Sequence, residues 1–96
     1  MSDFSLDVPP DFSDYEWETE AKGWFSLSLL IVAGKRYRLN FYDPMRLRQE
    51  IEDTLAKGEA FFEPNLMVVQ SVTRANMESA AARLAQSPEL AFLVEE

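Results

Sequence analysis

The feature that most constrains the fold is a pair of alternating apolar segments joined by a short turn. Residues 24–32 read WFSLSLLIV and residues 36–42 read RYRLNFY, with Gly34 between them. Period-two alternation in segments rich in aromatic and branched residues is typical of strands. A glycine also permits the positive φ that a tight hairpin turn needs. These two segments therefore predict a β-hairpin.

The alternation also assigns side chains to the two faces of this hairpin. Tyr37, Leu39 and Phe41 are expected to face the core, because they alternate with polar residues. Arg36 and Arg38 then point away from it. Unbroken alternation along residues 24–32 adds large apolar side chains to the same outer face. That apolar strip is expected to consist of Trp24, Leu30, Val32 and Tyr42.

Two later segments have the signals of helices. Asp43-Pro44 begins the first, because Asp can cap free N–H groups and Pro fits the first helical turn. Leu47, Ile51 and Leu55 give it an apolar stripe, and Gly58 ends it. Thr73 begins the second helix, which is expected to extend from residue 74 to about residue 86 and to stop at Ser87-Pro88.

The other expected elements are strands. Residues 65–72 (NLMVVQSV) are apolar on both faces and predict an interior strand. Residues 15–20 alternate aromatic or branched side chains with acids and predict an edge strand. Residues 90–94 fit either a strand or a short helix. The sequence therefore predicts an α+β fold: a small mixed sheet of three to five strands with two helices packed on one face, in the order (β)-β-β-α-β-α-(β).

The negative charge is concentrated near the N-terminus. Residues 1–23 contain seven acids and one base, a net charge of −6, whereas residues 24–96 contain ten acids and eight bases, a net charge of −2. Residues 1–13 include Pro9-Pro10 and show no sustained period, so we interpret them as a mobile acidic arm. Residues 14–96 are then one α+β domain. At 96 residues the chain has no room for a second core.

The side chains that most catalytic and metal sites use are missing. The chain has no His and no Cys, and its three glycines form no phosphate-binding loop. We therefore expect no catalytic residue, no cofactor and no metal. A carboxylate site is the best alternative, formed by acids around the end of the first helix, although alternating charges there also fit simple solvation. Those acids are Glu50, Glu52, Asp53 and Glu59.

Two groups of residues indicate a surface that binds another protein. The first is the N-terminal segment, where aromatic side chains alternate with acids that would attract a basic partner. The second is the outer face of the hairpin, where arginines flank aromatic rings. The acidic segment could dock on these arginines, or simply complete the sheet as a strand. The candidate partner-binding residues are Phe12, Tyr15, Glu16, Trp17, Glu18, Trp24, Arg36, Arg38 and Tyr42.

These observations favour a non-enzymatic adaptor, regulator or inhibitor that binds a protein. The partner is expected to be basic, or to be a second copy bound through the outer sheet face. Direct binding to nucleic acid or to a membrane is disfavoured by the negative charge. The alternatives are a small-ligand-binding protein or enzyme that uses carboxylates and arginines, and a structural subunit of an assembly. The absence of cysteine and of a signal-like N-terminus favours the cytoplasm.

Overall fold

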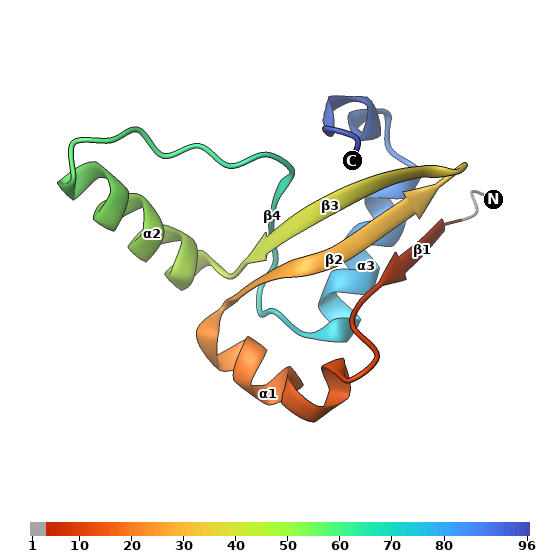
Figure 1. Cartoon of the computed structure of the whole chain (residues 1–96), viewed down its shortest axis with the longest axis horizontal. Helices are drawn as coiled ribbons and strands as arrows, with labels where there is room; N and C mark the ends of the chain where they lie inside the picture. Colours follow the sequence, from red (N-terminus) through yellow and green to blue (C-terminus); the bar gives the residue numbers. More distant parts are fainter. Residues whose placement is uncertain (1–3) are drawn as a thin grey trace.

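The computed structural model describes residues 4–96 and arranges them around one four-stranded sheet (Figure 1). The elements follow the order β-α-β-β-α-β-α, and a short 3₁₀ helix comes after the last of them. The bounds are β1 (Phe4–Asp7), α1 (Phe12–Lys22), β2 (Trp24–Val32), β3 (Lys35–Tyr42), α2 (Pro44–Ala56), β4 (Leu66–Val68), α3 (Arg74–Ala85) and η1 (Pro88–Phe92). The predicted α+β class is confirmed.

The sheet is mixed, as expected, with its strands in the order β1-β2-β3-β4. The pairs β1–β2 and β2–β3 are antiparallel, and β3–β4 is parallel. The predicted hairpin is confirmed as β2–β3. Its turn residues Ala33 and Gly34 have φ values of 51° and 80°. Positive φ at both central residues is the conformation that matches the twist of hairpin strands.

A bulge in β2 changes which side chains face the core. The register of β2 against β3 shifts between Phe25 and Ser28, and an extra residue in one strand moves the following side chains to the opposite face. Leu30 is paired with Tyr37, and both are buried. The predicted outer position of Leu30 and Val32 is therefore wrong, because both belong to the core cluster.

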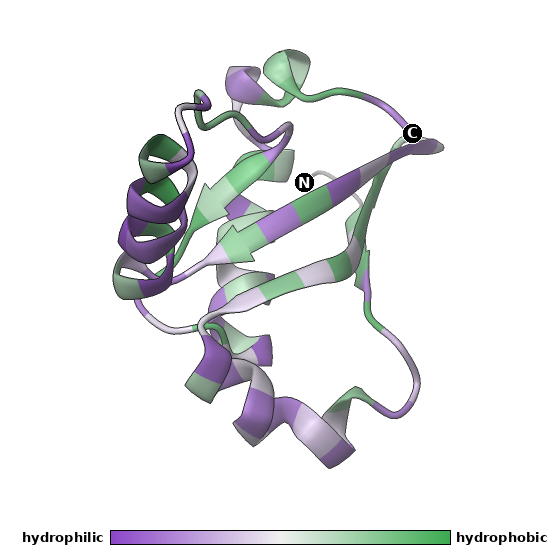
Figure 2. Ribbon diagram, turned by 60° about the vertical axis from the view of Figure 1, so that its left-hand side comes forward, coloured by the Kyte–Doolittle hydropathy of each residue, from purple (hydrophilic) through white to green (hydrophobic). Residues whose placement is uncertain are grey.

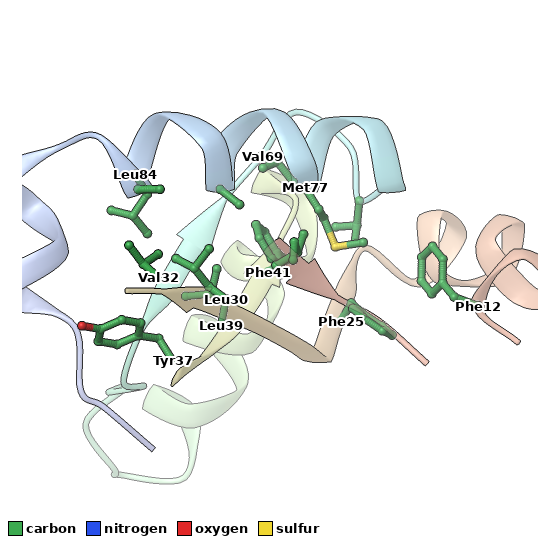
Figure 3. Close-up of a cluster of buried hydrophobic side chains, with 14 residues drawn as sticks. Phe12, Phe25, Leu30, Val32, Tyr37, Leu39, Phe41, Val69, Met77 and Leu84 are labelled. Carbon is green, nitrogen blue, oxygen red and sulfur yellow. The ribbon is translucent and has the colours of Figure 1, made fainter. Parts of the chain in front are cut away.

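The core lies between the inner face of the sheet and α3 (Figure 3). The predicted inward face of β3 is confirmed, since Tyr37, Leu39 and Phe41 are all buried. Met77 and Leu84 extend from α3 toward these strands. Ala81 and Ala85 are also buried on α3, and short side chains let a helix approach a sheet closely. The second predicted helix is thus confirmed.

Residues 15–20, predicted as an edge strand, form the middle of helix α1 instead. The helix is kinked at Tyr15, whose φ is −131°; Thr19 follows Tyr15 by four residues, about one turn, and Phe12 packs on Tyr15 across the kink. Phe12 and Thr19 are buried. The helix ends at Gly23, whose φ of 74° is left-handed and whose N–H donates to the carbonyl of Thr19. The predicted strand was wrong because the alternation of aromatic residues and acids coincided with a helical spacing of the buried residues.

The first described residues complete the sheet. Residues 4–7 form β1, paired with Leu29 to Val32 of β2, and Leu6 is buried. This agrees with the alternative in which the acidic segment adds a strand. The mobility expected of residues 1–13 stays a prediction, and residues 1–3 lie outside the described residues.

The segment predicted as an interior strand is shorter and lies at the edge of the sheet. Only Leu66–Val68 pair with β3, and Val68 is exposed. Asn65, just before β4, has a left-handed φ of 55°, and the strand ends three residues later, so most of the apolar run continues as a loop toward α3. The C-terminal residues 90–94 were left open between a strand and a short helix, and the first three of them belong to the 3₁₀ helix η1 (Pro88–Phe92).

Helix α2 begins as predicted but lies beside the sheet rather than on it (Figure 1). Asp43 Oδ1 accepts a hydrogen bond of 2.7 Å from the N–H of Arg46, and Pro44 occupies the first turn. None of the helix residues is buried, and its apolar residues Leu47 and Ile51 are only half-buried. The prediction that two helices pack on one face is therefore wrong for α2, because the helical residues of the core cluster come from α1 and α3 and none comes from α2.

Candidate functional site

A groove of about 460 Å³ lies between α1 and the first half of β2. Four residues of each element line it: Tyr15, Glu18, Thr19, Lys22, Trp24, Phe25, Ser26 and Leu27. The tight turn at Gly23 links the two elements and brings them side by side. The groove therefore combines a helix surface with a strand that emerges directly from that helix.

The strand wall of this groove carries two exposed apolar side chains. Leu27 lies within the bulge between Phe25 and Ser28 and is 55% exposed, and Trp24 lies before the bulge and is 37% exposed. Phe25 is buried and holds the wall in place, since its ring meets that of Phe12 edge-to-face at 4.9 Å. Large apolar side chains exposed beside a groove are typical of an interface.

The helix wall is supported from the core and carries acids on its outer side. Phe12 packs edge-to-face on Tyr15 at 5.5 Å, and burial and the nearby Asp11 carboxylate raise the pKa of the Tyr15 phenol. Asp14, Glu18 and Glu20 are exposed on α1. Among residues 4–96 these three acids form no salt bridge, because the four ion pairs all lie in other elements. Of the charged residues that line the groove, Glu18 is acidic and Lys22 is basic, so the excess negative charge lies on the rest of α1.

The structure brings together only part of the predicted binding set. Tyr15, Glu18 and Trp24 line the groove. Trp17 is also on α1, and 69% of its surface is exposed. Phe12 is fully buried, so it supports the groove from beneath and offers no surface to a partner.

Glu16 has a structural role that its sequence position did not reveal. Its Oε2 accepts a hydrogen bond of 2.8 Å from the backbone N–H of Arg74, the first residue of α3. A carboxylate at this end of a helix satisfies a free donor and complements the helix dipole. Glu16 therefore joins the acidic helix to the helix that covers the core.

Arg36 and Arg38 are exposed on the opposite side of the hairpin from the core, as predicted. The C-terminal segment binds the backbone of Arg36 and the side chain of Arg38. Arg38 Nε lies 2.9 Å from Glu96 Oε2, and the N–H of Glu96 donates to the carbonyl of Arg36 at 2.7 Å. Asn65 secures this segment, because its side-chain amide donates to the carbonyls of Arg38 and Val94. The acids of residues 4–23 make no salt bridge with either arginine.

Tyr42 lies on the outer face but is buried there. Its hydroxyl donates a hydrogen bond of 2.6 Å to Glu63 Oε2. Burial raises the pKa of Tyr42, and the hydrogen bond to Glu63 and the charge of that carboxylate raise it further. Tyr42 therefore fastens the loop after α2 to β3 and is not available to a partner. Glu63 was missed because it is separated by 21 residues from its phenol partner.

Two of the four carboxylates considered as an alternative ligand site pair with arginines. Glu50 pairs with Arg46 at 2.7 Å and Glu52 pairs with Arg48 at 3.0 Å, each one turn apart on α2. Within the described residues 4–96, no cluster of three or more acidic, His or Cys side chains is arranged to hold a metal ion.

No family model, curated protein or solved structure matches the chain. In the part of the chain from residue 4 onward, no helix combines the length and the apolar character needed to cross a membrane.

Proposed function

We propose that this protein is a non-enzymatic binding module that uses the groove between α1 and β2 to engage a basic segment of another protein. The observation that carries the proposal is the exposed apolar wall of this groove, formed by Trp24 and Leu27, beside the acidic helix α1, of which Glu18 lines the groove. An adaptor, a regulator and an inhibitor would each use such a surface. We also assign it to the cytoplasm, in keeping with a chain that lacks cysteine.

The two walls would contribute differently to binding. Trp24 and Leu27 can bury apolar surface against a partner, and tryptophan is among the side chains that contribute most to interface energy. Glu18, with Asp14 and Glu20 beyond it, would attract lysines and arginines and orient them before contact. Trp17 is also exposed on α1 but does not line the groove. The matching partner segment has one or two apolar side chains flanked by bases.

The composition supports binding rather than catalysis. The chain has no imidazole and no thiol. Glu18, the acid that lines the groove, is exposed, whereas carboxylates that act in catalysis are commonly buried. Recognition by shape and charge needs neither an imidazole nor a thiol.

Affinity capture with groove variants tests this proposal. The immobilised full chain is expected to retain a basic protein from cell extract at about 0.05 M salt and to release much of it at about 0.5 M, because screening weakens exposed charge pairs. Trp24→Ala and Glu18→Lys should each reduce capture by about tenfold, which corresponds to about 1.4 kcal/mol. Glu89→Lys, an exposed charge reversal in η1, is the matched control.

The results that contradict the proposal are equally specific. Equal capture by the wild type, Trp24→Ala and Glu18→Lys would place the interface elsewhere. Loss of capture by Glu89→Lys to the same extent would indicate that net charge alone governs retention, without a defined groove.

A further inference from the structure

Helix α2 has two unlike sides, and one of them faces away from the protein. Its half-buried residues are Arg46, Leu47, Glu50, Ile51 and Thr54. Its outward side carries four side chains at spacings of three, four and three residues: Met45, Arg48, Glu52 and Leu55. Residues at such spacings form one continuous seam along a helix. In Figure 2 the middle turns of this helix are mainly purple, with green toward its ends.

All four seam residues are strongly exposed. Met45 is 81% exposed and Leu55 is 59% exposed, although both are large apolar side chains. The side chains of Arg48 and Glu52 are 81% and 63% exposed. Their mutual ion pair is 3.0 Å long, and such an exposed pair within one helix contributes little to stability. The seam can therefore exchange this contact for another at small cost.

The seam on one copy of α2 is complementary to the same seam on a second, antiparallel copy. In a twofold antiparallel pair of helices, residue i of one copy contacts residue j of the other, and j contacts i. A twofold axis that crosses the outward side of α2 at the level of residue 50 places Met45 against Leu55 of the second copy. It also places Arg48 against Glu52 of the second copy. Each contact occurs twice, so the pair has apolar contacts at both ends and two ion pairs between them.

We propose that α2 is a self-association surface, on which a second copy of this chain docks with its own α2 antiparallel. A basic partner would be repelled by Arg48, and an anionic membrane would be repelled by Glu52 and Asp53, whereas the reversed seam satisfies both signs. The contact spans about 15 Å of helix, at 1.5 Å per residue. Such a short seam gives a weak, concentration-dependent dimer. This surface is separate from the α1–β2 groove.

A charge-exchange experiment by analytical ultracentrifugation tests the pairing. Arg48→Glu and Glu52→Arg each place like charges opposite one another in the homodimer, and each should weaken dimerisation by about tenfold or more, equivalent to about 1.4 kcal/mol. An equimolar mixture of the two variants should form a heterodimer, because one seam is then acidic and the other basic. The double variant Arg48→Glu with Glu52→Arg should dimerise like the wild type.

Two controls distinguish loss of the seam from misfolding and from a general effect of net charge. Circular dichroism of each variant must show unchanged helix content. Glu89→Arg, a charge reversal outside α2, should leave the dimer unaffected. A wild type that stays monomeric up to about 1 mM, where binding worth about 4 kcal/mol would be visible, overturns the proposal. So does a dimer that the single variants do not weaken, or a mixture of the two that does not associate.

Discussion

Helices α2 and α3 are nearly equal in length and begin in similar ways, yet they have opposite relations to the core. They contain 13 and 12 residues, and each is capped by the side chain just before it, Asp43 and Thr73. Four residues of α3 are buried, whereas none of α2 is. The helix with the more conspicuous apolar stripe in its sequence is thus the one that stays outside the core.

The difference shows that an amphipathic pattern identifies the side of a helix that can be buried. The pattern does not identify the surface against which that side packs. The buried side of α3 includes two alanines, Ala81 and Ala85, which let the helix approach the sheet closely, and it carries no charged residue. The side of α2 that faces the body mixes Leu47 and Ile51 with Arg46 and Glu50, and these charges keep part of it hydrated. Stability is therefore expected to depend strongly on α3 and weakly on α2.

The largest expected effect is on the buried side of α3. Met77 is fully buried, so Met77→Ala should lower the free energy of unfolding by about 2–5 kcal/mol through lost contacts and a cavity. Leu55→Ala on α2 is the matched control, and it should change stability by less than about 0.5 kcal/mol. Urea denaturation followed by circular dichroism measures both. Similar losses of unfolding free energy for Met77→Ala and Leu55→Ala would contradict the claim that α3 contributes more to stability than α2.

The next effect concerns the junction where α2 joins the body. A Cβ added at Gly23 would lie 2.7 Å from Asp43 Cγ, and the φ of 74° at Gly23 disfavours any side chain. Gly23→Ala should therefore cost about 1–3 kcal/mol. Adding Asp43→Ala removes the clash along with the helix cap, so the double variant should lose less than the sum of the two single losses. Strict additivity in a double-mutant cycle would contradict this contact.

The hydrogen bond from Tyr42 on β3 to Glu63 in the loop after α2 predicts that stability depends on pH. Tyr42→Phe should lose about 1.5 kcal/mol at neutral pH, because it removes a hydrogen bond to a carboxylate. Burial and Glu63 raise the pKa of Tyr42 in the folded protein, so the unfolded chain releases this proton first, near pH 10. The wild type should then lose stability as the pH rises through that region.

Urea denaturation of the wild type and of Tyr42→Phe, at neutral pH and at alkaline pH, measures the contribution of this hydrogen bond. The gap in stability between the wild type and Tyr42→Phe should narrow as the pH rises, since phenylalanine has no proton to release. A gap that stays constant would mean that Glu63 and burial do not hold the phenolic proton.

The smallest expected effect distinguishes two neighbouring acids of α1. Glu16→Ala should lower the free energy of unfolding by about 1 kcal/mol, because it removes the hydrogen bond to the first N–H of α3. Glu18→Ala removes the same charge from the same helix, but its carboxylate makes no such bond, so its effect should stay within about 0.5 kcal/mol. Thermal unfolding compares them, and equal melting temperatures would exclude the capping role of Glu16.

The sequence was sufficient where local chemistry decides the structure. Asp43-Pro44 and Thr73 begin their helices as predicted, and Gly34 forms the hairpin turn. The sequence was insufficient where contacts between distant residues decide the structure. The bulge after Phe25 reverses the faces of Leu30 and Val32, and no residue pattern in the segment predicts this bulge.

The same limit applies to the candidate site. Tyr15, Glu18 and Trp24 were chosen for their chemistry, and they meet in one groove only because Gly23 turns the chain between a helix and a strand. The helical spacing of Phe12, Tyr15 and Thr19 was present in the sequence but competed with an equally clear alternation of period two. Tyr42 is buried and bonded to Glu63, and Arg38 pairs with Glu96, and both of these acids are distant along the chain.

Native-state hydrogen exchange, resolved by NMR, tests most directly whether the sheet and α3 form the stable core while α2 lies outside it. Amides in the middle of α3 and in the paired parts of β2 and β3 should exchange only through global unfolding. Amides of α2 should exchange through a local opening of clearly lower free energy, in a dilute solution where no second copy covers them. Protection of α2 equal to that of α3 under those conditions would contradict the account.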